Sequence, residues 1–145
     1  SAASDVYKRQ AINLETDNAK KADNAYKAAS VLASAKKLSQ ARSYAQKAIS
    51  FNENFGAPYI LIAQLYAGNY KWNDEPALNK CTFFAAIDKL QRAKAVDPSV
   101  AEEANKLISS YSAYTPEAKD LFMLGYKAGD RITIGGWIGE TTTIR

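Results

Sequence analysis

Histidine is absent from the 145-residue sequence, and cysteine occurs once, as Cys81. The absence of histidine removes the commonest general base and the commonest metal ligand of proteins. A single cysteine excludes an internal disulfide, and we interpret Cys81 as a buried, inert thiol rather than a reactive one. These shortages predict that the chain has no metal site and no histidine-based chemistry.

Long apolar runs are also missing. No segment approaches the roughly 18 consecutive apolar residues that span a bilayer, and the short run Ile60–Tyr66 is interrupted by Gln64. We therefore expect no transmembrane segment and assign this run to the core. No signal peptide is visible in the sequence.

Motifs for catalysis and cofactor binding are scarce as well. The glycine pair at 135–136 lacks the following helix that would complete a phosphate-binding loop. Acidic pairs occur at 74–75 and at 102–103, but adjacent side chains on a helix do not face each other. Both pairs stand where helices are expected to begin, and acidic residues stabilise the helix dipole there. The sequence therefore predicts no enzyme, no catalytic residue and no cofactor.

No charge of one sign dominates. The net charge is +4, from 19 basic and 15 acidic residues that are interleaved along the chain. A nucleic-acid-binding protein is expected to gather its basic residues in one stripe. The densest basic cluster is typical of the solvated face of a helix, so we expect no nucleic-acid partner; its members are Lys20, Lys21, Lys27, Lys36 and Lys37.

What the sequence does contain is an internal repeat. Ala41–Ala48 matches Ala86–Ala93, which begins 45 residues later, and Tyr66 corresponds to Tyr111 at the same spacing. Repeated helical pairs stack into solenoids, which usually hold a partner rather than transform a substrate. The repeat therefore indicates a binding scaffold and leaves its ligand open.

Apolar spacing and cap residues divide the chain into helices. Ser39, Asp74 and Thr115 are suited to cap the helices that follow them, and Ser99 with Glu102 matches a capping box. The expected helices span about 17–38, 40–51, 58–67, 75–96, 99–112 and 116–128.

The two ends of the chain differ from this helical region. Residues 131–145 are β-branched and aromatic, with glycines between them, and predict two short strands around Gly139–Glu140. A lone hairpin is marginal in water, so it must cover the exposed end of the helices, which we favour, or pair with another chain. Residues 1–16 are poorly patterned, and the string SDVYKRQ resembles a translated sequencing adaptor. We expect this segment to lie outside the helical domain, residues 17–130, with the natural N-terminus missing.

The repeat resembles the tetratricopeptide repeat (TPR). The second helix of a TPR unit carries small, bulky and small residues at spacings of four and three, followed by proline, as do Ala86, Leu90, Ala93 and Pro98. The first helix requires an aromatic, a large aliphatic, a small and an aromatic residue, here Tyr59, Ile62, Ala63 and Tyr66. The resemblance covers residues 17–114. A TPR unit has about 34 residues, so the 45-residue spacing implies an insertion, which we place between Gly68 and Cys81.

The closing residues resemble a particular group of TPR proteins. VDPSVAEEANKLISSY and GGWIGETTTIR are similar to the C-terminal part of TPR proteins of Bacteroidetes bacteria, which are often exported. This resemblance implies that the chain is the C-terminal module of a larger protein of the periplasm or cell envelope.

The resemblance also implies a binding groove, because the inner face of the first helix in each TPR unit touches the ligand. The positions carried over are Asp23, Tyr26, Ser30, Ile60, Gln64, Glu102, Asn105 and Ser109. Ordinary solvated helix surface is the alternative for each of them. Tyr26 and Ser30 stand where TPR domains that grip a chaperone's C-terminal carboxylate have Lys and Asn, so that subtype is disfavoured. Tyr70 and Trp72, in the insertion, are further candidates for a binding hot spot or pack under a loop.

Together these patterns predict an all-α protein, a TPR-like α-solenoid of about three helical hairpins with a short C-terminal β-hairpin. The expected function is non-catalytic: a protein- or peptide-binding or assembly scaffold. One alternative is a structural module that self-associates through its hairpin. Another is a glycan-binding accessory domain that uses Tyr70, Trp72 and the polar groove residues.

Overall fold

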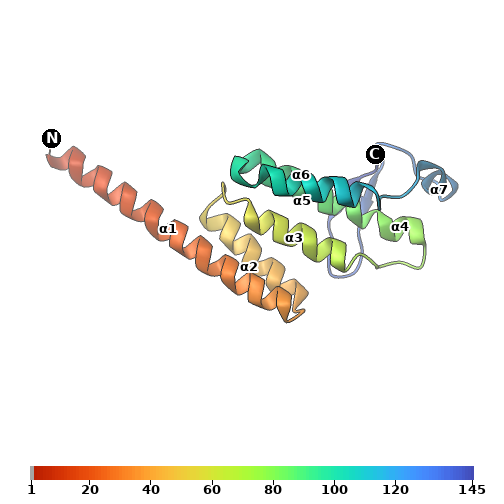
Figure 1. The fold of residues 1–145 in the computed structure, drawn as a ribbon, viewed down its shortest axis with the longest axis horizontal. Helices are drawn as coiled ribbons and strands as arrows, with labels where there is room; N and C mark the ends of the chain where they lie inside the picture. Colours follow the sequence, from red (N-terminus) through yellow and green to blue (C-terminus); the bar gives the residue numbers. More distant parts are fainter. Residues whose placement is uncertain (1) are drawn as a thin grey trace.

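The computed structural model describes residues 2–145, the side chain of residue 12 excepted; Ser1, part of the expected N-terminal segment, lies outside the described residues. Helices hold 69% of the chain, and a small two-stranded hairpin follows them, so the predicted all-α class is confirmed. The elements in Figure 1 are α1 (Ala2–Ser34), α2 (Leu38–Phe51), α3 (Ala57–Gly68), α4 (Pro76–Lys80), α5 (Thr82–Val96), η1 (Pro98–Val100), α6 (Ala101–Ser112), α7 (Ala118–Met123), β1 (Arg131–Thr133) and β2 (Thr141–Thr143).

The long helices pack in chain order. α1 packs mainly on α2, α2 on α3, α3 on α5, and α5 on α6, while the short helices α4 and α7 lie together at the far end of the molecule (Figure 1). Short connections between successive helices favour this antiparallel arrangement. Each long helix therefore buries its apolar stripe against its neighbours in sequence.

Small side chains line the contact between α1 and α2. Ala22 and Ala29 of α1, and Ala41, Ala45 and Ala48 of α2, are completely buried. Alanine pays no side-chain entropy in a helix and lets a neighbouring backbone approach closely. Beyond this contact the core is larger, with Ile62, Tyr66 and Leu90 among its fully buried side chains.

Helix α1 begins much earlier than the sequence predicts. It starts at Ala2 rather than near residue 17, and its first half projects away from the other helices (Figure 1). The side chains described between residues 2 and 17 are exposed, and Asn18 is the first that is half-buried. Glycine and proline do not occur before Gly56, so nothing stops the helix from extending. Apolar patterning thus marks where packing begins, not where the helix begins.

The end of α1 is closed by a Schellman motif. The N–H of Lys37 donates to the carbonyl of Leu32 (2.9 Å), and the N–H of Lys36 donates to that of Ala33 (3.0 Å). Lys36 sits in the left-handed position of this motif with φ of 58°, where glycine is the usual residue.

We expect Lys36→Gly to raise the free energy of unfolding by about 1 kcal/mol, because the left-handed conformation costs an L-residue about 1–2 kcal/mol. Urea unfolding of the two proteins measures the difference. Lys37→Gly is the matched control: Lys37 has a φ of −91°, so glycine there relieves no left-handed backbone and should gain at most a few tenths of a kcal/mol as an N-cap residue. Equal effects of the two substitutions would contradict the assignment.

None of the four predicted N-cap residues occupies the N-cap position of its helix, and before α7 that position belongs to Glu117 rather than Thr115. Ser39 lies inside the first turn of α2, whose N-cap position is Lys37. Before α6 the capping residue is Asp97, whose carboxylate accepts hydrogen bonds from the N–H of Ser99 (3.1 Å) and from that of Gly56 (2.8 Å). The Ser99 hydroxyl and then the Gly56 N–H hold the pKa of the Asp97 carboxyl below its usual range. Asp97 therefore connects the α2–α3 turn to η1. A local capping pattern in the sequence cannot predict such a contact between distant segments.

The close approach at Gly56 leaves no room for a side chain. A Cβ atom there would lie 2.5 Å from Cγ2 of Val100 and 2.8 Å from Cβ of Asp97. Glycine is required at this position by packing.

The helix expected over residues 75–96 is broken at Cys81 into α4 and α5, and its N-cap position is Glu75 rather than Asp74. The side chain of Asn79 is turned toward the preceding loop and hydrogen-bonds to its backbone. The final helix, α7, is also shorter than expected and ends at Met123 instead of near residue 128. Gly125, with φ of 91°, turns the chain away from the helix. This turn allows the N–H of Tyr126 to donate a hydrogen bond to the carbonyl of Leu121 (2.9 Å).

The predicted C-terminal hairpin is present, but its turn is placed differently. β1 and β2 are antiparallel with Thr133 opposite Thr141, so the turn centres on Trp137 rather than on Gly139–Glu140. Gly136 and Gly139 both have positive φ, and the N–H of Ile134 donates to the carbonyl of Glu140 (2.8 Å). The two glycines together allow a wide turn where a tight one was expected.

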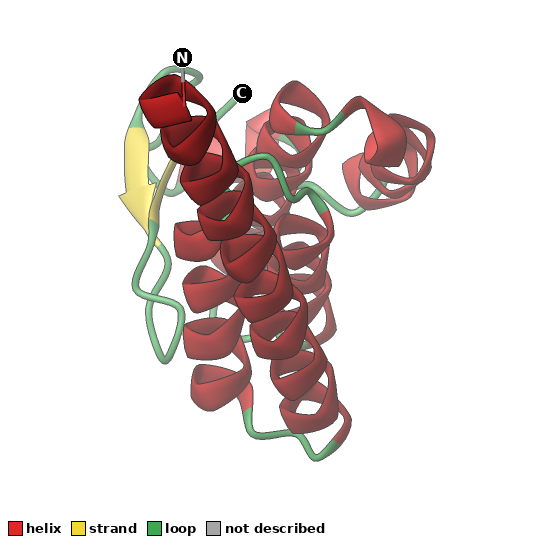
Figure 2. Cartoon of the chain, turned by 90° about the vertical axis from the view of Figure 1, so that its left-hand side faces the viewer, coloured by secondary structure: helices red, strands yellow, loops and turns green. Residues whose placement is uncertain are grey.

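One face of the hairpin packs on the helices (Figure 2). Its buried apolar residues belong to the same core as those of α3 and α5; they are Ile132, Ile134, Ile138 and Ile144. Arg42 of α2 donates hydrogen bonds to the carbonyls of Trp137 (2.8 Å) and Ile138 (2.6 Å). On α5, Asp88 accepts a hydrogen bond from the hydroxyl of Thr142 (2.6 Å). Contacts from two helices thus fix the hairpin against the side of the stack.

Candidate functional site

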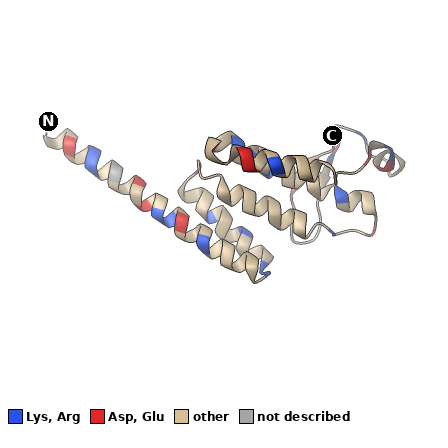
Figure 3. Ribbon diagram, viewed as in Figure 1, with Lys and Arg blue, Asp and Glu red and all other residues tan. Residues whose placement is uncertain are grey.

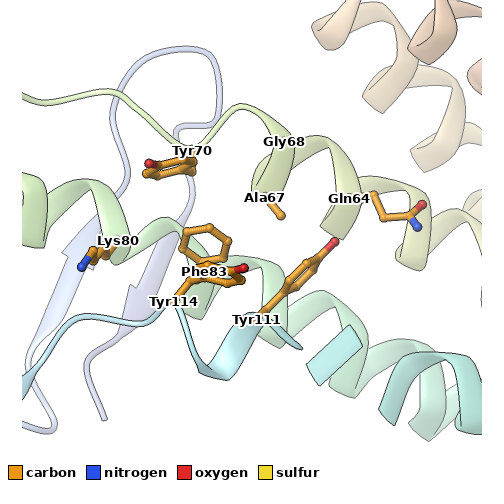
Figure 4. Close-up of a pocket in the computed structure, with 8 residues that line it drawn as sticks. All are labelled: Gln64, Ala67, Gly68, Tyr70, Lys80, Phe83, Tyr111 and Tyr114. Carbon is orange, nitrogen blue, oxygen red and sulfur yellow. The ribbon is translucent and has the colours of Figure 1, made fainter. Parts of the chain in front are cut away.

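A cavity of about 460 Å³ opens between the end of α3, the beginning of α5 and the end of α6 (Figure 4). Its size lies within the range of about 300–1,000 Å³ typical of ligand pockets. The lining residues are Gln64, Ala67, Gly68, Tyr70, Lys80, Phe83, Tyr111 and Tyr114. Four of these eight residues are aromatic, and small residues of α3 leave the space open.

The aromatic wall is organised around Phe83, which is only 6% exposed. The centroid of its ring lies 5.1 Å from that of Tyr70, 5.9 Å from that of Tyr111 and 5.4 Å from that of Tyr114. Offset and tilted ring pairs at these separations are stabilising. Tyr114 is 56% exposed, so the cluster reaches from the core to the surface.

Tyr111 and Tyr114 enter the cavity from the last turn of α6 and the turn after it. Tyr111 is half-buried, and burial raises the pKa of its hydroxyl. Tyr111 therefore stays neutral near pH 7 and acts through its ring and hydroxyl group.

The remaining wall comes from the insertion before α5, which folds into a loop held by buried polar side chains. The Asn79 side chain accepts hydrogen bonds from the N–H groups of Trp72 (2.8 Å) and Asn73 (2.7 Å) and donates to the carbonyl of Asn73 (2.7 Å). The Thr82 hydroxyl donates to the carbonyl of Tyr70 (2.9 Å). These bonds fix the backbone that follows Tyr70, from its own carbonyl to Asn73, and so help to position its ring in the cavity.

The charged residue that lines the cavity is basic. Lys80 lines the cavity, and Nζ of Lys71 lies 6.0 Å from the ring centroid of Tyr70. None of the eight lining residues is acidic. Elsewhere, both signs are interspersed, as Figure 3 shows along α1. The cavity therefore combines aromatic walls with a positively charged rim.

Protein-family models, curated proteins and solved structures offer no match to this chain. What the cavity does must therefore be inferred from the chain's own residues.

Two of the residues that the sequence singled out meet in this cavity, Gln64 and Tyr70. Trp72 does not: it is half-buried, and its ring lies so close to the hairpin that a Cβ atom on Gly135 would be 2.7 Å from Cε3 of Trp72. The side chain of Trp72 thus packs under the hairpin turn, and its neighbour Tyr70 is the one that faces the cavity.

The other expected groove residues are spread over α1, α3 and α6. Ile60 is 4% exposed and belongs to the core, so its assignment to a ligand-binding surface is wrong. Tyr26 packs edge-on against Phe55 with ring centroids 5.3 Å apart, and Asn105 accepts a hydrogen bond from Lys94 (2.7 Å). Ser30 is half-buried, and the remaining three residues are exposed: Asp23, Glu102 and Ser109.

Sequence reasoning missed Phe83, Tyr111 and Tyr114 as site residues. In the sequence, Tyr111 stands out only by its match to Tyr66 in the repeat. The two residues differ in burial, since Tyr66 is completely buried and Tyr111 is not. The available signal was the clustering of aromatic residues at the two boundaries of the insertion and at the end of α6.

Groups suited to metal binding or covalent chemistry are few. Residues 2–145 hold no cluster of three or more potential metal ligands, residue 12 being left aside. Cys81 is buried, and burial raises the pKa of its thiol to about 11. Among the helices of the same residues, none has the length and hydropathy to cross a membrane.

Proposed function

We propose that this chain is a non-catalytic, TPR-like scaffold that binds a protein or peptide, and that the aromatic cavity holds a side chain of the partner. One observation carries the proposal: an open cavity whose walls are aromatic and whose own side chains leave it empty. Exposed tyrosine beside a desolvated aromatic cluster is typical of binding hot spots. The envelope location and the larger parent protein that the resemblance implies stay predictions.

The polar groups around the cavity support a peptide as the occupant. Gln64 is exposed on α3 and carries both a donor and an acceptor, which suits the backbone amides of an extended chain. Tyrosine hydroxyls add further polar groups beside the rings. Such a mixture of apolar walls and few polar groups fixes the orientation of a bound segment.

The alternative of self-association through the hairpin has less support than peptide binding. Its strands have three residues each, and one of its faces is occupied by the helices. Short edge strands are poor templates for pairing with another chain. The glycan-binding alternative loses one of its two aromatic residues, since Trp72 packs on Gly135.

The proposal is tested by selecting peptides from a displayed random library on the purified chain and measuring their affinities for variants. We expect Tyr114→Ala to weaken the selected peptides about tenfold or more, as for a hot-spot residue. Tyr114 is 56% exposed, so its removal leaves the fold intact.

The matched control is Tyr44→Ala, which removes a tyrosine that is 42% exposed on α2. Peptides whose affinity responds equally to the two substitutions, or to neither, would overturn the cavity as the binding site.

A further inference from the structure

We propose that the partner segment in this cavity carries an aromatic side chain with acidic residues next to it. This inference rests on the proposed function and adds the chemistry of the ligand. It follows from two features of the cavity, its space beside α3 and the charge of its rim.

The space beside α3 fits a planar ring. Ala67 and Gly68 supply no bulk, and a Cβ atom on Gly68 would meet no atom within 4 Å. Across the cavity stand Tyr111 and Phe83, with their rings directed toward this opening (Figure 4). Aromatic rings pair favourably at centroid separations of about 4.5–7 Å, beyond the gain from burying their area. An aromatic anchor therefore completes a cluster that already joins four rings.

The rim selects for acidic neighbours of that anchor. Lys80 and Lys71 are both exposed, and the only contact found for either within the described residues is that of Lys71 with the ring of Tyr70. With no carboxylate lining the cavity, an acidic residue beside the anchor is attracted by Lys80, and a basic one is repelled by it. Charge complementarity of this kind acts on specificity and association rate and is weakened by salt.

Three fluorescein-labelled peptides of equal length test the inference, each with a central tryptophan flanked by Glu, Gln or Lys. We expect fluorescence anisotropy at low salt to give the affinity order Glu, Gln, Lys, with at least a tenfold difference between the first and the last. The difference should shrink in 0.5 M NaCl, where screening is stronger.

Two charge reversals separate a local effect from that of net charge. Lys80→Glu is expected to abolish or invert the preference for the Glu-flanked peptide. Lys20→Glu makes the same change in net charge on exposed α1 and should leave the order unchanged. Equal responses to both would overturn the inference, because the preference would then be one of overall charge.

The outcomes also distinguish this inference from the proposed function. Peptides that bind with equal affinity whatever their flanks, and that lose affinity in Tyr114→Ala, overturn the acidic flanks and leave the cavity as the binding site. If the library peptides that depend on Tyr114 contain neither aromatic nor acidic residues, the inference is likewise overturned and the cavity remains the binding site. Binding that is insensitive to Tyr114→Ala overturns both.

Discussion

Replacing Arg42 with alanine is expected to release the hairpin from the helices and to lower the free energy of unfolding by about 3–5 kcal/mol. The guanidinium donates to the carbonyls of Trp137 and Ile138 and to the hydroxyl of Tyr66 (2.9 Å). Hydrogen bonds to a charged group contribute about 1.5–3 kcal/mol each, but those made by one half-buried side chain do not add in full. The guanidinium carbon also lies 5.0 Å from the Trp137 ring centroid, a favourable cation–π distance. Urea unfolding followed by tryptophan fluorescence measures the loss.

Two further substitutions give this prediction its controls. Arg42→Lys keeps the charge but not the planar fork that reaches three acceptors at once, so most of the loss should remain. Arg92→Ala removes an exposed arginine from α5 and should change stability by less than about 0.5 kcal/mol. A loss in Arg42→Ala no larger than that in Arg92→Ala would mean that the hairpin is held by its isoleucines alone.

Replacing Asn79 with alanine is expected to cost about 2–4 kcal/mol, because it leaves the N–H groups of Trp72 and Asn73 without their acceptor, at about 1–3 kcal/mol for each unsatisfied group. Asn79 is 9% exposed, so water replaces its amide poorly. The loop that carries Tyr70 should loosen, and peptide affinity should fall with it. Thermal unfolding and hydrogen exchange at the amides of residues 72 and 73 measure the two effects.

Asn79→Asp separates the two functions of this side chain. The carboxylate can still accept from both N–H groups, but it cannot donate to the carbonyl of Asn73 and meets it as a repulsive oxygen. We expect Asn79→Asp to lower the free energy of unfolding, but by less than Asn79→Ala does. Asn69→Ala is the control, since Asn69 is exposed and its side chain donates a hydrogen bond to the carbonyl of Leu65 (2.9 Å), within its own turn of helix. Unchanged exchange at residues 72 and 73 in Asn79→Ala would contradict the assignment.

Most of the helical framework could be predicted from the sequence. Pro58 marked the first turn of α3, and the alanines of α2 recurred at the spacing of a buried stripe. Such signals are local, since spacing and turn chemistry act within a few residues. Helix ends were less predictable, because they depend on partners elsewhere. Asp97 caps through contacts that include Gly56, which lies 41 residues away.

The break between α4 and α5 illustrates the same limit. Residues 76–96 contain no glycine or internal proline, so propensity alone favours one helix. The amide of Asn79, two residues before the break, satisfies backbone groups of the preceding loop, which would otherwise be buried without partners. That need arises only when the loop packs beneath the hairpin, with Trp72 against Gly135.

The candidate site was predictable only in part for a related reason. Gln64 and Tyr70 were singled out, but the rings of Phe83, Tyr111 and Tyr114 are indistinguishable by type and spacing from core residues. The exposure of the two tyrosines follows from where α6 ends, and the opening beside Phe83 follows from where the insertion places its loop. Both are properties of the assembled helices.

The attachment of the hairpin to Arg42 has a consequence for the order of folding. The helices contact their neighbours in sequence, so each pair closes a short loop at low entropic cost. The bonds from Arg42 to the hairpin turn span 95 and 96 residues, and contacts of such separation form slowly. We therefore expect docking of the hairpin to be the last step of folding, onto a surface that α2, α3 and α5 have already built. After this step, the hairpin and the helices that it contacts gain or lose stability together.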